Sequence, residues 1–359
     1  MRVAIVSLHW NSKSILGELL DAHITSLLGT DYDDFIVLIV DNGSKDGTPD
    51  YIQGKFRDPR LKILRLSRSY SFAIANNIGL NYAMRFKPDV IVFINNDTIV
   101  KRDWLRKLIE AFKDPNVGAA QPLIMNFNGT IQFLGGFVDK LGRSPSLGSI
   151  SGSQIAERFV EIAVRHNVAL KIYRPLGACV AVRAELLKEI KGFNPYLYFS
   201  HEELALATEI YARGYKIVCV PNSVIYHKYG PSLGRRKDLV PHAIANKFVF
   251  IILYMPRKYL FGSLVGRLIF EIALWVKNMA LRRRLSITPF IVGLSYTLKF
   301  LIRAHTLRMG FSKIREELMT RTPLYLNERK LIAYAANELM RYNISLFTDY
   351  INDKIADHS

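Results

Sequence analysis

Two carboxylates stand at the ends of apolar runs, where a ligand could bind. Asp97 lies in the stretch INNDT, which continues the apolar run VIVF, and Asp41 closes the stretch FIVLIVD. Asp and Asn also suit ordinary turns, so each stretch alone could be a strand that ends in a turn. In open α/β sheets, however, ligands bind beyond the carboxyl ends of the strands. An Asp at that place can hold a divalent cation, with phosphate oxygens and water completing its shell.

A second group of chemically active residues lies further along the chain. Glu202 and Glu203 are adjacent and begin a segment with helical spacing, where the helix dipole stabilises carboxylates. A carboxylate held there could be a general base for a hydroxyl, or it could lie on a solvated helix face. His227 follows an apolar run in IYHKYG and could contact a metal or a phosphate, although a single His is more often structural.

Two further polar stretches suit a nucleotide. VDNGSKDGT places Gly43 and Gly47 behind Asp41, where glycine permits a tight turn and the carboxylate could accept hydrogen bonds from a base or a ribose. FAIANNIG puts Asn77 in the first turns of a helix that starts near Ser71 or Phe72, and a helix N-terminus favours phosphate. Neither the dinucleotide fingerprint G-x-G-x-x-G nor a P-loop is present.

The hydrophobic pattern predicts the scaffold that positions these residues. Apolar runs of strand length alternate with segments of helical spacing, which predicts a parallel sheet with right-handed crossovers. The predicted strands are 3–8, 35–41, 61–66, 90–95, 178–183 and 215–221, and the predicted helices are 14–28, 48–56, 73–86 and 202–213. Residues 126–153 are rich in Gly, Ser and Asn, which indicates a surface loop or hairpin.

In order and spacing, these motifs resemble the family 2 glycosyltransferases with a GT-A fold, and in particular their rhamnosyltransferase-like members. The resemblance runs from about Val3 to Tyr229 through VDNGSKDGT, FAIANNIG, INNDT, PLGACVAVRAELLKEIKGFNP, HEEL and VPNSVIYHKYG. It implies a Rossmann-like α/β fold with a mostly parallel sheet, and inverting, metal-dependent transfer of a sugar to a hydroxyl acceptor. We expect a catalytic domain over 1–238 and a basic, amphipathic helical region over 239–359.

The resemblance also implies a role for each matching residue. Asn11, Asp41, Ser44, Asn77 and Asn95 would line the nucleotide-sugar site, and Asp97 with His227 would hold Mg²⁺ or Mn²⁺ against the diphosphate. Glu203 aligns with the catalytic base, which is usually the Asp of a Glu-Asp pair, so the choice between Glu202 and Glu203 stays open. Two positions depart from the family: Ala205 replaces an Asp and Glu209 replaces an Arg. These departures point to an unusual acceptor side or to reduced activity.

The expected partners follow from the same resemblance. A dTDP- or UDP-sugar is the expected donor, and a lipid-linked glycan or another cell-surface polysaccharide precursor is the expected acceptor. A nucleotidyltransferase would need a Gly-rich, Arg- and Lys-bearing signature near the first strand, and SLHWNSKSIL lacks it. A non-catalytic sugar- or lipid-binding protein would explain Ala205 and Glu209, and it would bind nucleotide without transfer.

Positive charge is concentrated in the C-terminal part of the chain. The 359 residues carry a formal net charge of +18, and between Lys228 and Arg321 there are 18 Lys or Arg and 4 acids. The longest apolar stretch, 285–302, is interrupted by Pro289 and Lys299, so we expect no clean transmembrane helix. Basic helices lying in an anionic membrane interface fit this pattern, and a helical subdomain with solvated cations is the alternative. No nucleic-acid-binding motif is recognisable, so nucleic acid is not an expected partner.

The two cysteines and the N-terminus bear on location. Cys179 and Cys219 lie in apolar runs, which predicts buried thiols and no disulfide framework. This usage fits a reducing compartment. The N-terminal segment MRVAIVSLHW does not have the pattern of a signal peptide. The expected location is therefore the cytoplasm, with peripheral association at the cytoplasmic face of the membrane.

Overall fold

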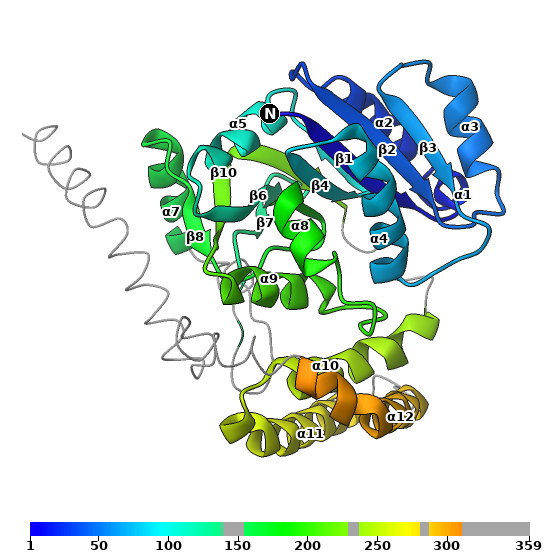
Figure 1. Cartoon of the computed structure of the whole chain (residues 1–359), viewed down its shortest axis with the longest axis vertical. Helices are drawn as coiled ribbons and strands as arrows, with labels where there is room; N and C mark the ends of the chain where they lie inside the picture. The colour runs from blue at the N-terminus through cyan, green and yellow to red at the C-terminus, as the bar shows by residue number, and fades with distance from the viewer. Residues whose placement is uncertain (137, 139–153, 229–236, 281–286, 311–359) are drawn as a thin grey trace, which may run out of the picture.

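A computed structural model describes residues 1–136, 138, 154–228, 237–280 and 287–310. In this part of the chain, one curved ten-stranded sheet has helices on both faces, and a layer of three helices lies beneath it (Figure 1). The strand order is β3-β2-β1-β4-β9-β6-β10-β5, with β7 paired to β6 and β8 paired to β10. The predicted α/β class with a mostly parallel N-terminal sheet is confirmed.

The N-terminal half of the sheet is parallel, as the alternating pattern predicts. It comprises strands β1 (Val3–His9), β2 (Phe35–Asp41), β3 (Leu61–Arg65) and β4 (Val90–Asn95), helices α1 (Ser12–Leu16), α2 (Glu18–Leu28), α3 (Thr48–Lys55) and α4 (Phe72–Ala83), and a 3₁₀ turn η1 (Met84–Phe86). In the β1 register, His9 lies opposite Asp41 and Leu8 lies opposite Asn95. The polar residues that end these strands therefore meet at one edge of the sheet.

The other half of the sheet is mixed, and the sequence patterns found only part of it. Its strands are β5 (Thr98–Val100), β6 (Val117–Met125), β7 (Ile131–Phe133), β8 (Leu170–Ile172), β9 (Cys179–Arg183) and β10 (Lys216–His227), and its helices are α5 (Trp104–Glu110), α7 (Gln154–Arg165), α8 (Ala184–Ile190) and α9 (Glu202–Ala212), with a 3₁₀ turn η2 (Ala111–Lys113). Strand β10 continues to His227 beyond the predicted end at 221, because a register irregularity between Val220 and Val224 accommodates Pro221.

Alternating strand residues feed two apolar cores, one on each face of the sheet. On β1, Ala4 and Val6 join the core under α4, α8 and α9, whereas Val3 and Ile5 join the core under α2, α3 and α5. Such alternation is what a sheet buried on both faces requires. Both thiols are buried, as predicted, and burial raises the pKa of Cys219 to about 12.

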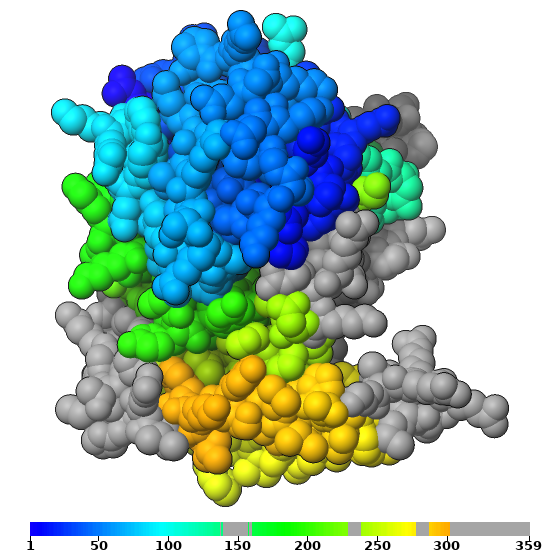
Figure 2. Space-filling model, turned by 90° about the vertical axis from the view of Figure 1, so that its right-hand side faces the viewer, coloured from blue at the N-terminus to red at the C-terminus, as the bar shows by residue number. Residues whose placement is uncertain are grey.

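The C-terminal helices form the third layer. They are the 3₁₀ turn η4 (Lys237–Leu239), α10 (Val240–Tyr254), α11 (Arg257–Ala280) and α12 (Thr288–Gly310). Phe250 and Tyr254 of α10 belong to the same apolar core as α9, so α10 is packed on the sheet domain. The space-filling view shows α11 and α12 as a yellow and orange layer along the underside of that domain (Figure 2).

One helix in the described part of the chain, Arg257–Lys277, is long and apolar enough to cross a membrane, with a mean hydropathy of 1.6. The expectation that no segment meets this criterion is therefore wrong. It overlooked a helix whose central charges are few: Arg267 and Glu271 lie one turn apart and pair with each other.

Candidate functional site

Asp97 and His227 come together because of strand pairing. Asp97 lies in the turn between β4 and β5, and β5 runs antiparallel to the end of β10 with Thr98 opposite His227. The Nε2 atom of His227 lies 3.2 Å from Oδ1 of Asp97, and both side chains are buried. The two residues that the resemblance assigns to one metal are thus adjacent in space, although 130 positions separate them in the sequence.

Gln132 of β7 sets the orientation of the His227 ring. Its Nε2 donates to Asn126 and to the His227 carbonyl, so its Oε1 faces Nδ1 of His227 at 2.6 Å. The tautomer with its proton on Nδ1 suits this contact and has a lone pair on Nε2, as metal-binding histidines require. The Asp97 Oδ1 atom facing this lone pair makes no hydrogen bond. Two facing acceptors fit a cation between them.

The donor set at this corner is small. Among the described residues, no cluster of three or more His, Cys, Asp or Glu could hold a metal. Asp97 and His227 alone would supply two ligands, which suits Mg²⁺ or Mn²⁺ when a diphosphate and water supply the others. The arrangement fits a cation that binds together with a phosphorylated ligand.

Asp41, Ser44 and Asn11 form a second corner at the same sheet edge. The backbone N–H of Ser44 donates to Asp41 Oδ2 at 3.2 Å, and the Ser44 hydroxyl accepts from the backbone N–H of Asn11 at 2.8 Å. Asn11 Oδ1 accepts from the Lys45 amide. The buried Oδ1 atom of Asp41 has no hydrogen-bond partner among the described residues. A ligand hydroxyl or amine that donates to it would remove the cost of this unpaired buried acceptor.

Gly43 holds the turn behind this corner. Its φ of +71° lies in the left-handed region, and a Cβ would come within 2.6 Å of the Arg68 backbone. The predicted tight turn is confirmed, because only glycine fits such a close approach.

The two predicted amides take different places. Both polar atoms of the Asn77 side chain bind the Phe193 backbone, at 2.8 Å each, so this amide fixes the loop before α9. Asn95 ends β4, and its carbonyl accepts from the Thr98 hydroxyl in the turn that carries Asp97. Ser71 caps α4 by accepting from the Ile74 amide, which confirms the predicted helix start.

A buried polar chain behind the Asp97 turn escaped the sequence patterns. Asn96 donates to the Ser12 hydroxyl at 2.8 Å, and Ser12 contacts Nδ1 of His9 at 3.1 Å. The Ser7 hydroxyl then bridges His9 to His23. Nδ1 of His23 contacts the carbonyl of Thr98 at 2.8 Å. This series of hydrogen bonds therefore stabilises the turn that carries Asp97.

Burial favours the neutral form of both His9 and His23 in this hydrogen-bonded series. Desolvation lowers the pKa of His23 to about 4, and desolvation, aided by the nearby His23, lowers the pKa of His9 well below its ordinary value. The unfolded chain therefore binds more protons than the folded chain below pH 6.5. The contribution of the two neutral histidines to the unfolding free energy is complete above pH 6.5, and it is lost as the pH falls through about 4.

We expect acid to weaken the fold through these two residues. Between pH 6.5 and 4, His23 alone removes up to about 1.4 kcal/mol of unfolding free energy per pH unit, and His9 acts in the same direction. Urea unfolding at a series of pH values measures this slope. His23→Gln cannot take up the proton and should flatten the slope, and an unchanged slope would assign the acid sensitivity to other groups.

The acidic pair at the start of α9 has two different environments. Glu203 is partly exposed, and its Oε1 accepts from Nη1 of Arg174 at 2.8 Å. Glu202 is buried, and its Oε1 has no hydrogen-bond partner among the described residues. Burial and, secondarily, the neighbouring Glu203 raise the pKa of Glu202 well above its ordinary value. The environment of Glu202 thus favours its protonated form, whereas Glu203 is the member of the pair with a cationic partner.

Arg174 is built into the fold, and sequence patterns did not single it out. Its backbone exchanges two hydrogen bonds with Gly136, at 3.0 Å each, and a Cβ on Gly136 would meet its guanidinium at 2.8 Å. The guanidinium lies 5.0 Å from the centre of the Phe133 ring. Phe133 follows Gln132 on β7, so this short strand contacts both the Glu203 side and the His227 side of the site.

The two departures from the family pattern face inward. Ala205 is fully buried, and Glu209 pairs with Arg213 one turn on and accepts from the Tyr254 hydroxyl of α10 at 3.2 Å. Burial raises the pKa of Glu209. Glu209 therefore binds α9 to the C-terminal layer, which gives this unusual residue a structural partner.

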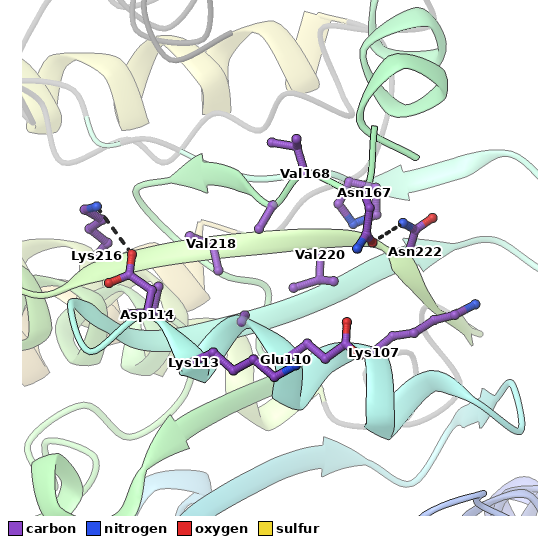
Figure 3. Close-up of a pocket in the computed structure, with 14 residues that line it drawn as sticks. Lys107, Glu110, Lys113, Asp114, Asn167, Val168, Lys216, Val218, Val220 and Asn222 are labelled. Atoms are coloured by element: carbon purple, nitrogen blue, oxygen red, sulfur yellow. Dashed lines mark hydrogen bonds and ion pairs between the residues drawn. The ribbon is translucent and has the colours of Figure 1, made fainter. Parts of the chain in front are cut away.

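A separate groove of about 450 Å³ lies between η2, the α7–β8 turn and β10 (Figure 3). Val218 and Val220 form its apolar side, and Lys216 and Asp114 at its rim pair at 3.5 Å. It follows the first half of β10, whereas His227 ends that strand. This groove is not part of the candidate active site.

The comparisons with solved structures identify the fold. The crystal structure of S. aureus TarS 1-349 in complex with UDP-GlcNAc is similar, with a TM-score of 0.53, 16% identity, and coverage of 89% of this chain and 92% of that chain. GalNAc-T7 with UDP, GalNAc and Mn²⁺ gives 0.55 at 15% identity, over 72% and 49% of the two chains. A Pyrobaculum calidifontis mannosyltransferase, PcManGT, in complex with GDP-Man and Mn²⁺ gives 0.50 at 17% identity, over 89% and 86%. The fold is the GT-A fold.

Comparison with models of protein families identifies the family to which the chain belongs. The model of glycosyl transferase family 2 matches residues 6–150, and that of glycosyl transferase family group 2 matches residues 90–312. The chain belongs to the family 2 glycosyltransferases, as its motifs predicted.

Two curated relatives are similar in sequence. The O-antigen biosynthesis protein RfbC of Myxococcus xanthus is 26% identical over 63% of this chain, but the match spans only 17% of that protein. An N-acetylglucosaminyl-diphospho-decaprenol L-rhamnosyltransferase of Mycobacterium tuberculosis is 25% identical over 60% of this chain and 74% of its own length.

Proposed function

We propose that this protein transfers a sugar from a nucleoside diphosphate to a hydroxyl group, with inversion at the anomeric carbon. The observation that carries the proposal is the pairing of Asp97 with His227, at the sheet edge that also bears Asp41. A bound Mg²⁺ or Mn²⁺ would supply positive charge to the leaving diphosphate, and Asp97 and His227 would hold it.

Side chains of the protein bind the nucleotide and accept the proton of the acceptor hydroxyl. Asp41 accepts a hydrogen bond from the base or ribose through its unpaired Oδ1, and the turn at Asn11 and Ser44 frames that contact. Glu203 accepts the proton of the acceptor hydroxyl. The acceptor oxygen then bonds to the anomeric carbon from the face opposite the diphosphate, and the diphosphate departs with the electron pair of the broken bond.

The substrates proposed here are supported by the relatives. The names of the rhamnosyltransferase and O-antigen biosynthesis relatives favour a lipid-linked glycan or polysaccharide precursor as acceptor, and we propose a dTDP- or UDP-sugar as donor. With such an acceptor, we propose that the enzyme acts at the cytoplasmic face of a membrane. We assign residues 1–238 to catalysis and residues 239–359 to the approach of the membrane-bound acceptor.

A thermal-shift series tests donor binding. Each nucleoside diphosphate is added with and without Mn²⁺, and a ligand at 100 times its Kd should stabilise the protein by about 2.7 kcal/mol. A shift that needs both Mn²⁺ and one particular base would identify the donor nucleotide. Without a shift for any nucleoside diphosphate, the proposal of a working donor site would be abandoned.

A further inference from the structure

Helix α11 has the reverse of the usual polarity for a surface helix. Ser263, Arg267 and Glu271, spaced one turn apart, are buried against the rest of the protein. A helix on the surface of a soluble protein normally buries its apolar stripe and exposes its charges. In α11 the polar stripe faces inward.

The outward face of α11 is apolar from Phe261 to Val276. Phe261 is 79% exposed and Ile269, two turns further on, is 61% exposed. The other exposed apolar side chains of this face and its flanks are Val265, Leu268, Ile272, Leu274 and Val276. Scattered exposed apolar residues are normal, but a continuous row of this length marks an interaction surface.

The inward face is fixed to α10 by charges. Glu271 accepts from Lys247 of α10 at 2.8 Å and from Arg267 of its own helix. All three side chains are largely buried. Breaking such a buried cluster by removing one partner is costly, so α11 is held along α10, which is itself packed on the catalytic domain.

Helix α12 extends the apolar surface. Among the α12 side chains that the structure describes (288–301), the buried positions are Gly293 and Thr297, which are small or polar, whereas Ile291 and Leu298 are more than half exposed. A Cβ on Gly293 would come within 2.8 Å of the Pro241 carbonyl, so α12 packs tightly at the start of α10. Both helices thus lie along the underside of the domain (Figure 2), and both carry exposed apolar residues.

The positive charge of residues 257–310 indicates what kind of partner binds the apolar surface of α11 and α12. From 257 to 310, the sequence has ten Lys or Arg and one acid, Glu271. Arg257, Lys258 and Lys277 are exposed near the two ends of α11, and Lys299 is exposed on α12. A second copy of such a surface would be repelled by like charge, whereas an anionic lipid headgroup layer would be attracted to it.

We propose that the outer face of α11 and α12 inserts in the plane of an anionic lipid leaflet and does not cross it. The apolar side chains enter the acyl boundary, and the cations around them contact headgroups. The charged attachment to α10 keeps α11 flat against the domain, although its length and composition would allow it to span. The inference deepens the proposed function, on which it rests for the identity of the acceptor, because it brings the catalytic domain to the membrane surface.

Vesicle flotation of the full chain tests this surface without nucleotide, metal or acceptor. Phosphatidylcholine vesicles with phosphatidylglycerol should float the protein at low salt, and pure phosphatidylcholine vesicles should float much less. The double variant Phe261→Gln and Ile269→Gln keeps the charge and should bind the anionic vesicles at least roughly tenfold more weakly. Val164→Gln, which changes an exposed apolar residue of α7, should bind like the wild type.

Three outcomes would overturn the proposal. In the first, the wild type stays in the soluble fraction with anionic vesicles at low salt. In the second, the double variant floats like the wild type. In the third, bound protein resists alkaline carbonate extraction, which would show a spanning helix instead of an in-plane one.

Two further measurements separate competing explanations. If light scattering without vesicles shows a stable dimer that the double variant abolishes, the surface belongs to a second copy and the lipid proposal fails. Asp97→Asn should float like the wild type, and the double variant should show the same Mn²⁺-dependent nucleotide shift as the wild type. Failure of the donor site and failure of the lipid surface are therefore distinguishable.

Discussion

Replacing Asp97 by Asn is expected to lower sugar transfer by roughly 10³-fold, the size of effect seen when one electrostatic contact to a developing charge is removed. The substitution keeps the shape of the side chain and deletes its charge. Asp97 faces Nε2 of His227 at 3.2 Å, so in the proposed site its loss would leave one protein ligand for the cation. Steady-state transfer assays across a Mn²⁺ series measure the effect.

The thermal shift of the same variant adds a second readout. The Mn²⁺-dependent part of the nucleotide shift should disappear, whereas any metal-independent part through Asp41 should remain. Asp103→Asn is a matched control, because this Asp lies on the surface near α5 and pairs with Lys107. Full transfer activity in Asp97→Asn would remove Asp97 from the site, and equal losses in both variants would indicate a general defect.

Residues at strand ends were predictable because their positions follow from local patterns. An apolar run that ends in Asp41 or Asn95 predicts a strand, whether the polar residue belongs to a turn or to a ligand site. Parallel pairing then brings such strand ends to one edge of the sheet. The order of the motifs then gave the family. His227 was assigned from its motif, although the predicted strand stopped at 221, because Pro221 hides the continuation of β10 behind an irregular register.

The residues that support the site were not predictable from local patterns. Gln132 and Arg174 acquire their roles through partners more than 25 positions away, and neither lies in a family motif. His9 and His23 look like isolated histidines in apolar or helical segments. Only the crossing of β1, α2 and the β4–β5 turn places them in one hydrogen-bonded chain.

The inverted polarity of α11 shows a different limit of sequence reading. Its composition predicted an amphipathic basic helix, but the pattern cannot tell which stripe faces the protein. Tertiary contacts decide this, because Lys247 of α10 pairs with Glu271 and draws the polar stripe inward. The apolar stripe is left outside.

Replacing Glu203 by Gln is expected to lower the rate of transfer by roughly 10²–10⁴-fold while leaving donor binding intact. Gln has the same shape but cannot take a proton from the acceptor hydroxyl. In the proposed site the nucleotide and Mn²⁺ would contact other residues, so the thermal shift should equal that of the wild type. This separation of binding from turnover distinguishes Glu203→Gln from Asp97→Asn.

The adjacent Glu202 provides the sharpest comparison. Because burial raises the pKa of Glu202 and so favours its neutral form, Glu202→Gln is a conservative change and should retain most of the transfer rate. The pH–rate profile of Glu202→Gln should therefore match that of the wild type. If Glu202→Gln were instead the inactive variant and Glu203→Gln remained active, the base would be Glu202, and the ion pair of Glu203 with Arg174 would be only a structural contact.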